Sequence, residues 1–130
     1  MNRTILLVGT AMGMLAIVLG AFAAHGLEKL VDAQAIDTFE TGVKYQMYHA
    51  LFLLFLGIWD GLPSKPKKIV FTLILLGVVL FSFSIYLLAL NSLTSFDFKI
   101  IGFLTPIGGV LMILGWAVMA YKILKTKKNG

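Results

Sequence analysis

Six polar residues in the first half of the chain have types and spacings that could do chemistry. Tyr45, Gln46 and His49 fall within about one turn, so a helix presents them on one side. Glu40 precedes Lys44 by four residues, an order and spacing that allow an ion pair on a helix. Together with the end of the preceding apolar run, they predict a polar pocket made of His25, Glu40, Lys44, Tyr45, Gln46 and His49.

His49 is the residue of this set best placed for a function. If Trp59 and Asp60 mark one membrane interface, the helical rise places His49 about 16 Å inside, near the bilayer middle. Ionisable side chains at that depth are costly and often mark function. Two interpretations are open: a neutral imidazole that fixes packing through a hydrogen bond, or a group that handles protons or solute. We expect a neutral ring directed at the first or third apolar helix.

The composition excludes several classes of function. The chain has no Cys, which excludes disulfides, thiolate catalysis and Cys-based metal sites. His25 and His49 are separated by most of the membrane depth, so we predict no metal site and no cofactor. The sequence contains no phosphate-binding loop, nucleophile elbow or paired intramembrane carboxylates, which favours a protein that is not an enzyme.

Long apolar helices must position these residues. The 130 residues are 59% hydrophobic and 13% charged, against about a quarter charged in soluble domains. The apolar runs predict one all-α domain over residues 1–130, an integral four-transmembrane-helix bundle with spans near 4–24, 43–60, 69–90 and 100–121. The third run is uninterrupted, and we expect its hydroxyls at Thr72, Ser82, Ser84 and Tyr86 to bond within their own helix.

The segment before the second span carries signals for a helix start. Asp37 and Glu40 have the spacing of a capping box, which predicts a helix from Thr38 onward. Between the first two spans, Leu27, Leu30 and Val31 share one helical face, with charged residues largely on the other. We predict a short exterior amphipathic segment there, at the membrane surface.

Positive charge predicts the orientation. With four spans, one side of the membrane holds eight basic residues, namely Arg3, Lys65, Lys67, Lys68, Lys122, Lys125, Lys127 and Lys128. The other side holds three, Lys29, Lys44 and Lys99. The richer side is cytoplasmic by the positive-inside rule, so both termini are predicted to be cytoplasmic. The basic residues behind the formal charge of +5 then flank the membrane. We therefore expect the lipid bilayer as the partner and no nucleic acid, and a homo-oligomer is possible.

The first apolar run has features of two kinds of segment. Its basic start and the small residues around Ala21 and Ala23 are also features of a secretory signal. The run is longer than a usual signal core, so we expect a retained helix. It carries small residues spaced four, three, four and four apart, at Gly9, Gly13, Ala16, Gly20 and Ala24. Small residues let helices approach closely in lipid, which predicts a helix–helix interface, with a substrate groove as the alternative.

The fourth span contains a candidate helix break at Thr105, Pro106, Gly108 and Gly109. Pro106 lacks a backbone donor. A kink packed against neighbouring helices is one outcome. A restart is another, with Thr105 as N-cap and Pro106 in the first helical position. The third is a broken helix whose backbone lines a cavity, as in transporters.

Four motifs resemble those of a known family; they cover residues 20–27, 39–51, 80–86 and 105–116. The chain resembles the YwdK/YgdD-like family of small bacterial membrane proteins, a domain of unknown function, over nearly its whole length. The resemblance implies a multi-pass protein of the bacterial plasma (inner) membrane and no particular reaction. It departs at Phe83, where Gly is expected between two serines. A bulky ring there is expected to hinder close helix packing.

Two functions from different classes follow from the sequence. The first is a non-enzymatic membrane component that acts in packing, assembly or lipid association. The second is a small oligomeric transporter or channel that uses the polar pocket at the exterior half of the first two spans. A polar cavity continuous across the bundle would favour the transporter, and a dry, filled bundle would favour the structural role.

Overall fold

The computed structural model describes residues 2–95 and 97–126, and nearly all of them are helical. The long helices are α1 (Asn2–His25), α2 (Ala33–Ile58), α3 (Ser64–Val78) and α5 (Leu104–Lys125). After α3 the helix continues through a π-helical turn into a shorter segment, namely η2 (Val79–Phe83) and α4 (Ser84–Ala89). Single 3-10 turns occur at η1 (Leu27–Lys29), η3 (Asn91–Leu93) and η4 (Phe98–Ile101).

Three segments of the described chain are long and apolar enough to cross a membrane: 2–29, 64–89 and 98–125. The fourth long helix, α2, has 26 residues but is not one of them. It carries Glu40 and Lys44 in its first half and Gln46 and His49 near its middle, and these residues lower its hydropathy. The prediction of an all-helical fold is therefore confirmed, and length and composition identify three of its helices as candidate spans.

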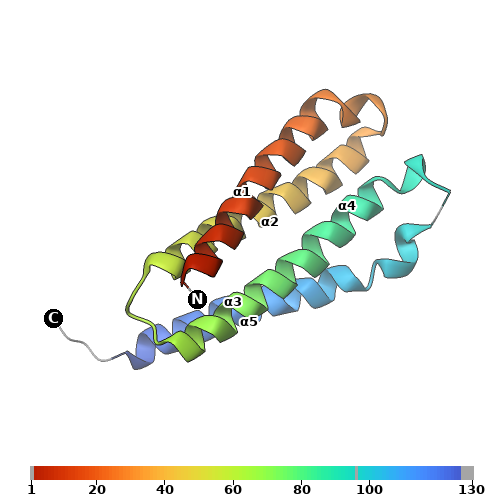
Figure 1. Cartoon of the computed structure of the whole chain (residues 1–130). Helices are drawn as coiled ribbons and strands as arrows, with labels where there is room; N and C mark the ends of the chain where they lie inside the picture. Colours follow the sequence, from red (N-terminus) through yellow and green to blue (C-terminus); the bar gives the residue numbers. More distant parts are fainter. Residues whose placement is uncertain (1, 96, 127–130) are drawn as a thin grey trace.

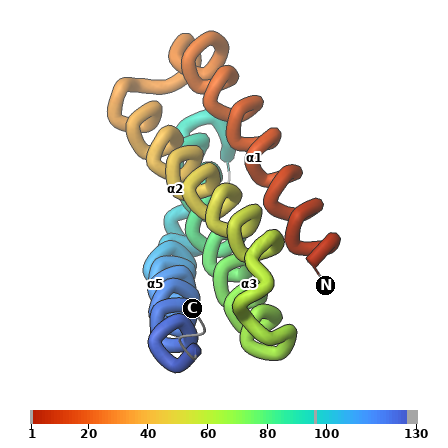
Figure 2. The backbone as a smooth tube through the Cα atoms, turned by 90° about the vertical axis from the view of Figure 1, so that its left-hand side faces the viewer, coloured from red at the N-terminus to blue at the C-terminus, as the bar shows by residue number. Residues whose placement is uncertain are grey.

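The long helices form two antiparallel hairpins (Figure 1). α1 packs against α2, and α3 packs against α5. α2 also packs against α3, η2 and α4, which joins the two hairpins (Figure 2). The start of α1, the 59–63 connection and the end of α5 gather at one end of the bundle, which we call the terminal end. The 26–32 and 90–103 connections lie at the other end, the loop end.

Two clusters of apolar side chains fill the bundle. The larger joins α1, α2, α3 and α5, and its fully buried members are Ile5, Leu53, Leu56, Val70 and Ile74. The smaller lies toward the loop end and contains Ala23, Leu27, Phe39, Tyr86 and Ala89. Leu27 is buried in the smaller cluster and Val31 packs against it, whereas Leu30 is exposed. The predicted apolar face is thus only partly formed, on a single 3-10 turn.

Small residues of α1 lie along its contact with α2. A methyl group added to Gly9 would lie 3.1 Å from the Ala50 carbonyl oxygen, and one on Gly20 would lie 3.5 Å from a Val43 methyl. Ala16 is also buried at this interface, and Gly13 faces Ala50.

The predicted last member of that stripe is wrong. Ala24 is exposed, and Ala23 is buried in its place. The interface follows steps of four and three residues, the average spacing of 3.5 that keeps two crossing helices in contact. A final step of four instead turns Ala24 away from α2.

The start of α2 differs from the prediction. The helix begins at Ala33, and Asp32 is its N-cap, because the Asp32 side chain accepts a hydrogen bond of 2.9 Å from the Ala35 amide. Asp37, the predicted cap, lies inside the helix, where its carbonyl accepts from the Thr41 hydroxyl. Asp32 competes successfully because its backbone is extended, as an N-cap requires, and the residues that follow favour helix.

The third apolar run forms one continuous helical segment over residues 64–89, and η2 within it is a π-helical turn that the sequence did not predict. Such turns add a residue to the helix and rotate the side chains that follow. Here the rotation points Ser82 into the bundle, fully buried, and leaves Phe83 44% exposed. The Phe83 ring therefore lies outside the contact that it was expected to hinder.

Pro106 lies in the first turn of α5, which begins at Leu104. The first four amides of a helix have no partner within the helix, so a proline there removes no hydrogen bond. Thr105 is not the N-cap; Phe103 occupies that position without a side-chain bond. The structure thus shows neither a kink nor a mid-helix break at Thr105 and Pro106, and Gly108 and Gly109 lie within a continuous helix.

Candidate functional site

The six residues of the predicted polar pocket do not come together. Gln46 and His49 are buried, Glu40 is half-buried, and His25, Lys44 and Tyr45 are exposed. The helix period explains the separation, because Glu40 and Lys44 lie on the side of α2 opposite to Gln46. The predicted pocket is therefore wrong as a single site, and its two buried members belong to separate hydrogen-bond sets.

The Gln46 amide joins three helices. It is 1% exposed, and its Nε2 donates to the Met12 carbonyl of α1 at 2.9 Å. The Tyr86 hydroxyl of α4 donates to its Oε1 at 2.6 Å. One helical turn away, the Ser82 hydroxyl donates to the Gly42 carbonyl of α2 at 2.8 Å. We call Gln46, Tyr86 and Ser82 the central polar set; it cross-links the two hairpins.

His49 is bonded at both ring nitrogens. Trp116 Nε1 of α5 donates to His49 Nε2 at 3.0 Å. An indole nitrogen can only donate, so Nε2 accepts, and the ring proton lies on Nδ1. Nδ1 then donates to the Tyr45 carbonyl at 2.7 Å. The predicted direction of His49 is wrong, because it faces α5 and not the first or third span. Its neutral imidazole has no unmatched nitrogen.

Two further polar contacts fasten the ends of the bundle. At the start of α5, the Thr105 hydroxyl lies 2.6 Å from the Ser84 hydroxyl of α4. At the terminal end, Lys67 is 3% exposed and donates to the Trp59 carbonyl at 2.6 Å and to Asn2 Oδ1 at 3.1 Å. The Trp59 carbonyl follows the last residue of α2, where a cation is favoured by the helix dipole.

Sequence reasoning missed four of these residues. The hydroxyls of Ser82 and Tyr86 were expected to bond within their own helix, but both bond to α2. The expected self-bond is present for Thr72, which donates to the Lys68 carbonyl, and for Ser84, which donates to the Phe81 carbonyl, both at 2.9 Å. Lys67 was counted as a flanking charge. Trp116 carries an indole N–H within an otherwise apolar span. That hydrogen-bond donor is the one signal in the sequence that could have identified the partner of His49.

These contacts are hydrogen bonds that join one helix to another. Among the described residues, no buried side-chain nitrogen or oxygen lacks a hydrogen-bond partner. The same residues contain no group of three or more His, Cys, Asp or Glu side chains arranged to hold a metal ion. Each buried donor and acceptor is used by the protein itself.

A polar hollow of about 550 Å³ lies at the loop end. It opens between the first turns of α2 and the segment after α4, and not between α1 and α2 as predicted. Its polar lining consists of Asp32, Gln34, Thr38, Asn91, Ser92 and Lys99. Asp32 already caps α2, and the side-chain Oδ1 of Asn91 accepts a hydrogen bond of 2.7 Å from the Phe98 amide.

Apolar helices with exposed hydrophobic surface and matched internal polar groups define a helical membrane protein. Residues 19–109 match the model of a family described as "Protein of unknown function (DUF423)". The chain belongs to this family.

Relatives named as membrane proteins match almost end to end. UPF0382 membrane protein SSP2132 of Staphylococcus saprophyticus is 41% identical over 123 residues, covering 95% of this chain and 98% of that protein. YwdK of Bacillus subtilis is 34% identical, covering 95% and 98%. UPF0382 inner membrane protein YgdD of Escherichia coli is 35% identical, covering 99% and 95%. No solved structure matches the chain.

Proposed function

We propose that this chain crosses the bacterial plasma membrane four times and acts there as a non-enzymatic component in packing, assembly or lipid association. Both termini lie in the cytoplasm. The family relationship supports the membrane placement, because the similar Escherichia coli protein is named an inner membrane protein. No enzymatic or transport activity is attached to any of the named relatives.

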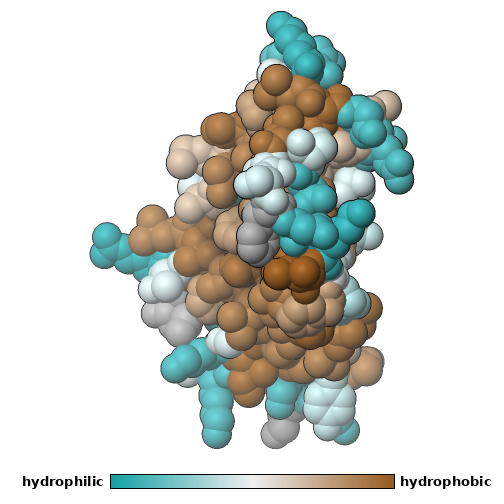
Figure 3. All heavy atoms as spheres, turned by 90° about the vertical axis from the view of Figure 1, so that its right-hand side faces the viewer, coloured by the Kyte–Doolittle hydropathy of each residue, from teal (hydrophilic) through white to brown (hydrophobic). Residues whose placement is uncertain are grey.

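The surface of α2 supports a fourth span. Its outward residues in the second half are large and apolar, including Leu51, Phe55 and Ile58, each more than half exposed. Its polar residues Gln46 and His49 point inward and are bonded to protein. Burial of their polar groups removes the main cost of placing α2 in lipid. Figure 3 shows hydrophobic residues over much of one face of the molecule, with hydrophilic side chains at its upper and lower ends and in a patch between them.

The charge bias supports the orientation. Lys65 and Lys68 at the start of α3, and Lys122 and Lys125 at the end of α5, all belong to the terminal end. Lys127 and Lys128 lie outside the described residues. The loop end has fewer basic residues, so the positive-inside rule assigns the terminal end to the cytoplasm.

The observation that carries the structural role is the matching of the central polar set. A solute path needs polar groups that can exchange protein partners for solute, and catalysis needs a nucleophile with a base beside it. Gln46, Tyr86 and Ser82 instead bond to other helices of the same chain. These three side chains, which lie in the centre of the bundle, are thus engaged in packing between helices. A transporter remains the rival function, with the loop-end hollow as its entrance.

Cysteine labelling tests orientation and role together, because the chain has no native Cys. Asp32→Cys should react with a membrane-impermeant maleimide on intact cells, and Lys65→Cys only after permeabilisation. Ser82→Cys, a nearly isosteric change, should stay unlabelled in both conditions. Ser84→Cys, at a second buried position, should also stay unlabelled. The Cys-free parent is the control. Labelling of Lys65→Cys on intact cells would reverse the orientation, and labelling of Ser82→Cys would favour a water-filled transport path.

A further inference from the structure

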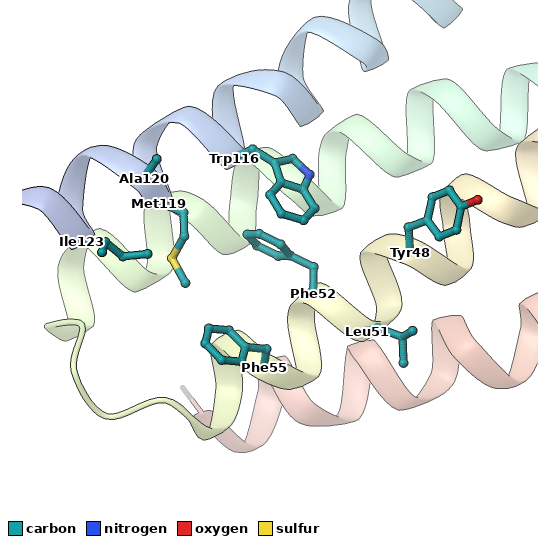
Figure 4. A pocket seen from close by; sticks show the side chains of 8 residues that line it. All are labelled: Tyr48, Leu51, Phe52, Phe55, Trp116, Met119, Ala120 and Ile123. Carbon is teal, nitrogen blue, oxygen red and sulfur yellow. The ribbon is translucent and has the colours of Figure 1, made fainter.

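The cleft between α2 and α5 is open on the surface of the bundle. Both helices pack on α3, and side chains join them to each other where Trp116 contacts His49 and Phe52. The cleft contains a groove of about 430 Å³, with Tyr48, Leu51 and Phe55 on one wall and Trp116, Ala120 and Ile123 on the other (Figure 4). Every one of these six residues is at least partly apolar, and most of them are half exposed. A groove of this kind is suited to an aliphatic chain.

The groove has the depth of one leaflet. It begins at Ile123, beside the basic end of α5, and ends at Trp116, whose indole crosses to His49. The intervening seven residues of α5 rise about 10 Å, within the roughly 15 Å of hydrocarbon that one leaflet contributes. Trp116 also lines the next hollow toward the loop end, so its ring divides the cleft. A partner helix would need a continuous surface across both leaflets, whereas one acyl chain needs only this half.

Positive charge lies at the terminal end of α5, close in sequence to the Ile123 end of the groove. Lys122 and Lys125 line a neighbouring hollow of about 310 Å³, together with residues of the 59–63 connection and the first turn of α3. Their ammonium groups lie 5.8 and 5.5 Å from the centre of the Tyr121 ring. Basic pockets at the cytoplasmic ends of membrane helices attract anionic headgroups. The two lysines are thus placed to meet a phosphate while its chain follows the groove.

From the groove, its depth and its charge we infer that this face holds one anionic phospholipid of the cytoplasmic leaflet. Its acyl chain lies between α2 and α5 as far as Trp116, and its headgroup phosphate meets Lys122 and Lys125. The inference rests on the proposed membrane placement, which makes the terminal end cytoplasmic. It deepens the proposed lipid association by naming the lipid class and the residues that select it.

Tryptophan quenching by brominated lipids tests the site. The chain has two Trp residues, so Trp59→Phe leaves Trp116 as the only reporter. The full-length variant is placed in phosphatidylcholine vesicles that contain either phosphatidylglycerol or phosphatidylcholine with brominated chains. Brominated phosphatidylglycerol should quench at a mole fraction about 25-fold lower. Lys122→Gln with Lys125→Gln should abolish that preference, at about fivefold for each lysine.

Matched variants separate the outcomes. Lys65→Gln with Lys68→Gln removes two charges from the same end and should keep the preference; an equal loss would mean only general surface attraction. Ala120→Phe, at an exposed position, should reduce quenching by both lipids because it fills the groove. Quenching that is equal for both lipids in the parent would overturn the headgroup site but leave the membrane placement intact. No quenching by either lipid would contradict both the headgroup site and the membrane placement. Protection of Trp116 from quenching that grows with protein concentration would assign the groove to a second copy of the chain.

Discussion

The contact of α1 with α2 and the contact of α3 with α5 both use small residues, but they leave different amounts of room. In the first, a methyl group on Gly13 would sit 3.7 Å from the nearest α2 atom, an ordinary contact. In the second, a methyl group on Gly108 would lie 2.7 Å from the Gly77 carbonyl oxygen and closer still to the Phe81 amide. At the first interface the closest backbone approach is at Gly9, 3.1 Å from the Ala50 carbonyl oxygen, so the second interface is the tighter of the two. Regularly spaced small residues in one helix, such as those of α1, therefore do not predict how closely two helices pack.

The difference has a structural cause. Gly77 of α3 and Gly108 of α5 face each other, so neither helix has a side chain at the crossing. The π-helical turn starts two residues after Gly77, and Phe81 within it packs its backbone on Gly108. In the contact of α1 with α2, the glycines of α1 face residues of α2 that carry side chains, namely Ala50, Leu53 and Val43. Close approach needs small residues on both partners, which is a property of the pair.

The largest effect is expected for Gly108→Ala. Its new methyl group would meet backbone atoms of Gly77 and Phe81, which cannot move without displacing η2. We expect a loss near the upper end of the overpacking range, about 3 kcal/mol, in unfolding from mixed detergent micelles. Gly109→Ala is the matched control, because its methyl group would lie 3.8 Å from the Phe81 ring. Equal stability of the two variants would mean that the close approach at Gly108 is absent.

His49→Ala should have an intermediate effect. It leaves the Trp116 donor without a partner and removes a ring packed 5.9 Å from the indole. An unmatched polar group and lost packing predict a loss of about 1–2 kcal/mol. His49→Gln keeps a donor and an acceptor and should lose less than about 1 kcal/mol, the size of one interhelical hydrogen bond in membranes. If His49→Gln is as damaging as His49→Ala in thermal unfolding, the hydrogen bond is not the stabilising contact.

Gly13→Ala should have the smallest effect and the opposite sign. The added methyl group meets only ordinary contacts, and alanine favours helix over glycine by up to about 1 kcal/mol. We expect unchanged or slightly raised thermal stability in detergent. Gly9→Ala, where the Ala50 carbonyl lies 3.1 Å away, is the sharper comparison and should be less favourable. A loss for Gly13→Ala as large as for Gly108→Ala would erase the difference between the two interfaces.

The sequence predicts the helices well and their mutual contacts less well. Apolar runs locate α1, α3 and α5, because hydropathy depends on the segment alone. The partners of Gln46 and His49 depend on which helices cross, and no spacing within α2 reveals Tyr86 or Trp116. Asp32 and Asp37 are both plausible caps, so local rules cannot choose between them. The π-helical turn has no local signature, since its benefit lies in turning Ser82 toward the Gly42 carbonyl of another helix.

The most direct test of the structural role is a double-mutant cycle between Gln46 and Tyr86. Gln46→Leu and Tyr86→Phe each remove one partner of the 2.6 Å hydrogen bond, and the paired variant removes both. If the central polar set cross-links the hairpins, the cycle should give a coupling of about 0.6–1.7 kcal/mol in detergent unfolding, the range known for membrane helices. A coupling of zero, with normal folding of all the variants, would contradict the account and return these residues to the rival transport function.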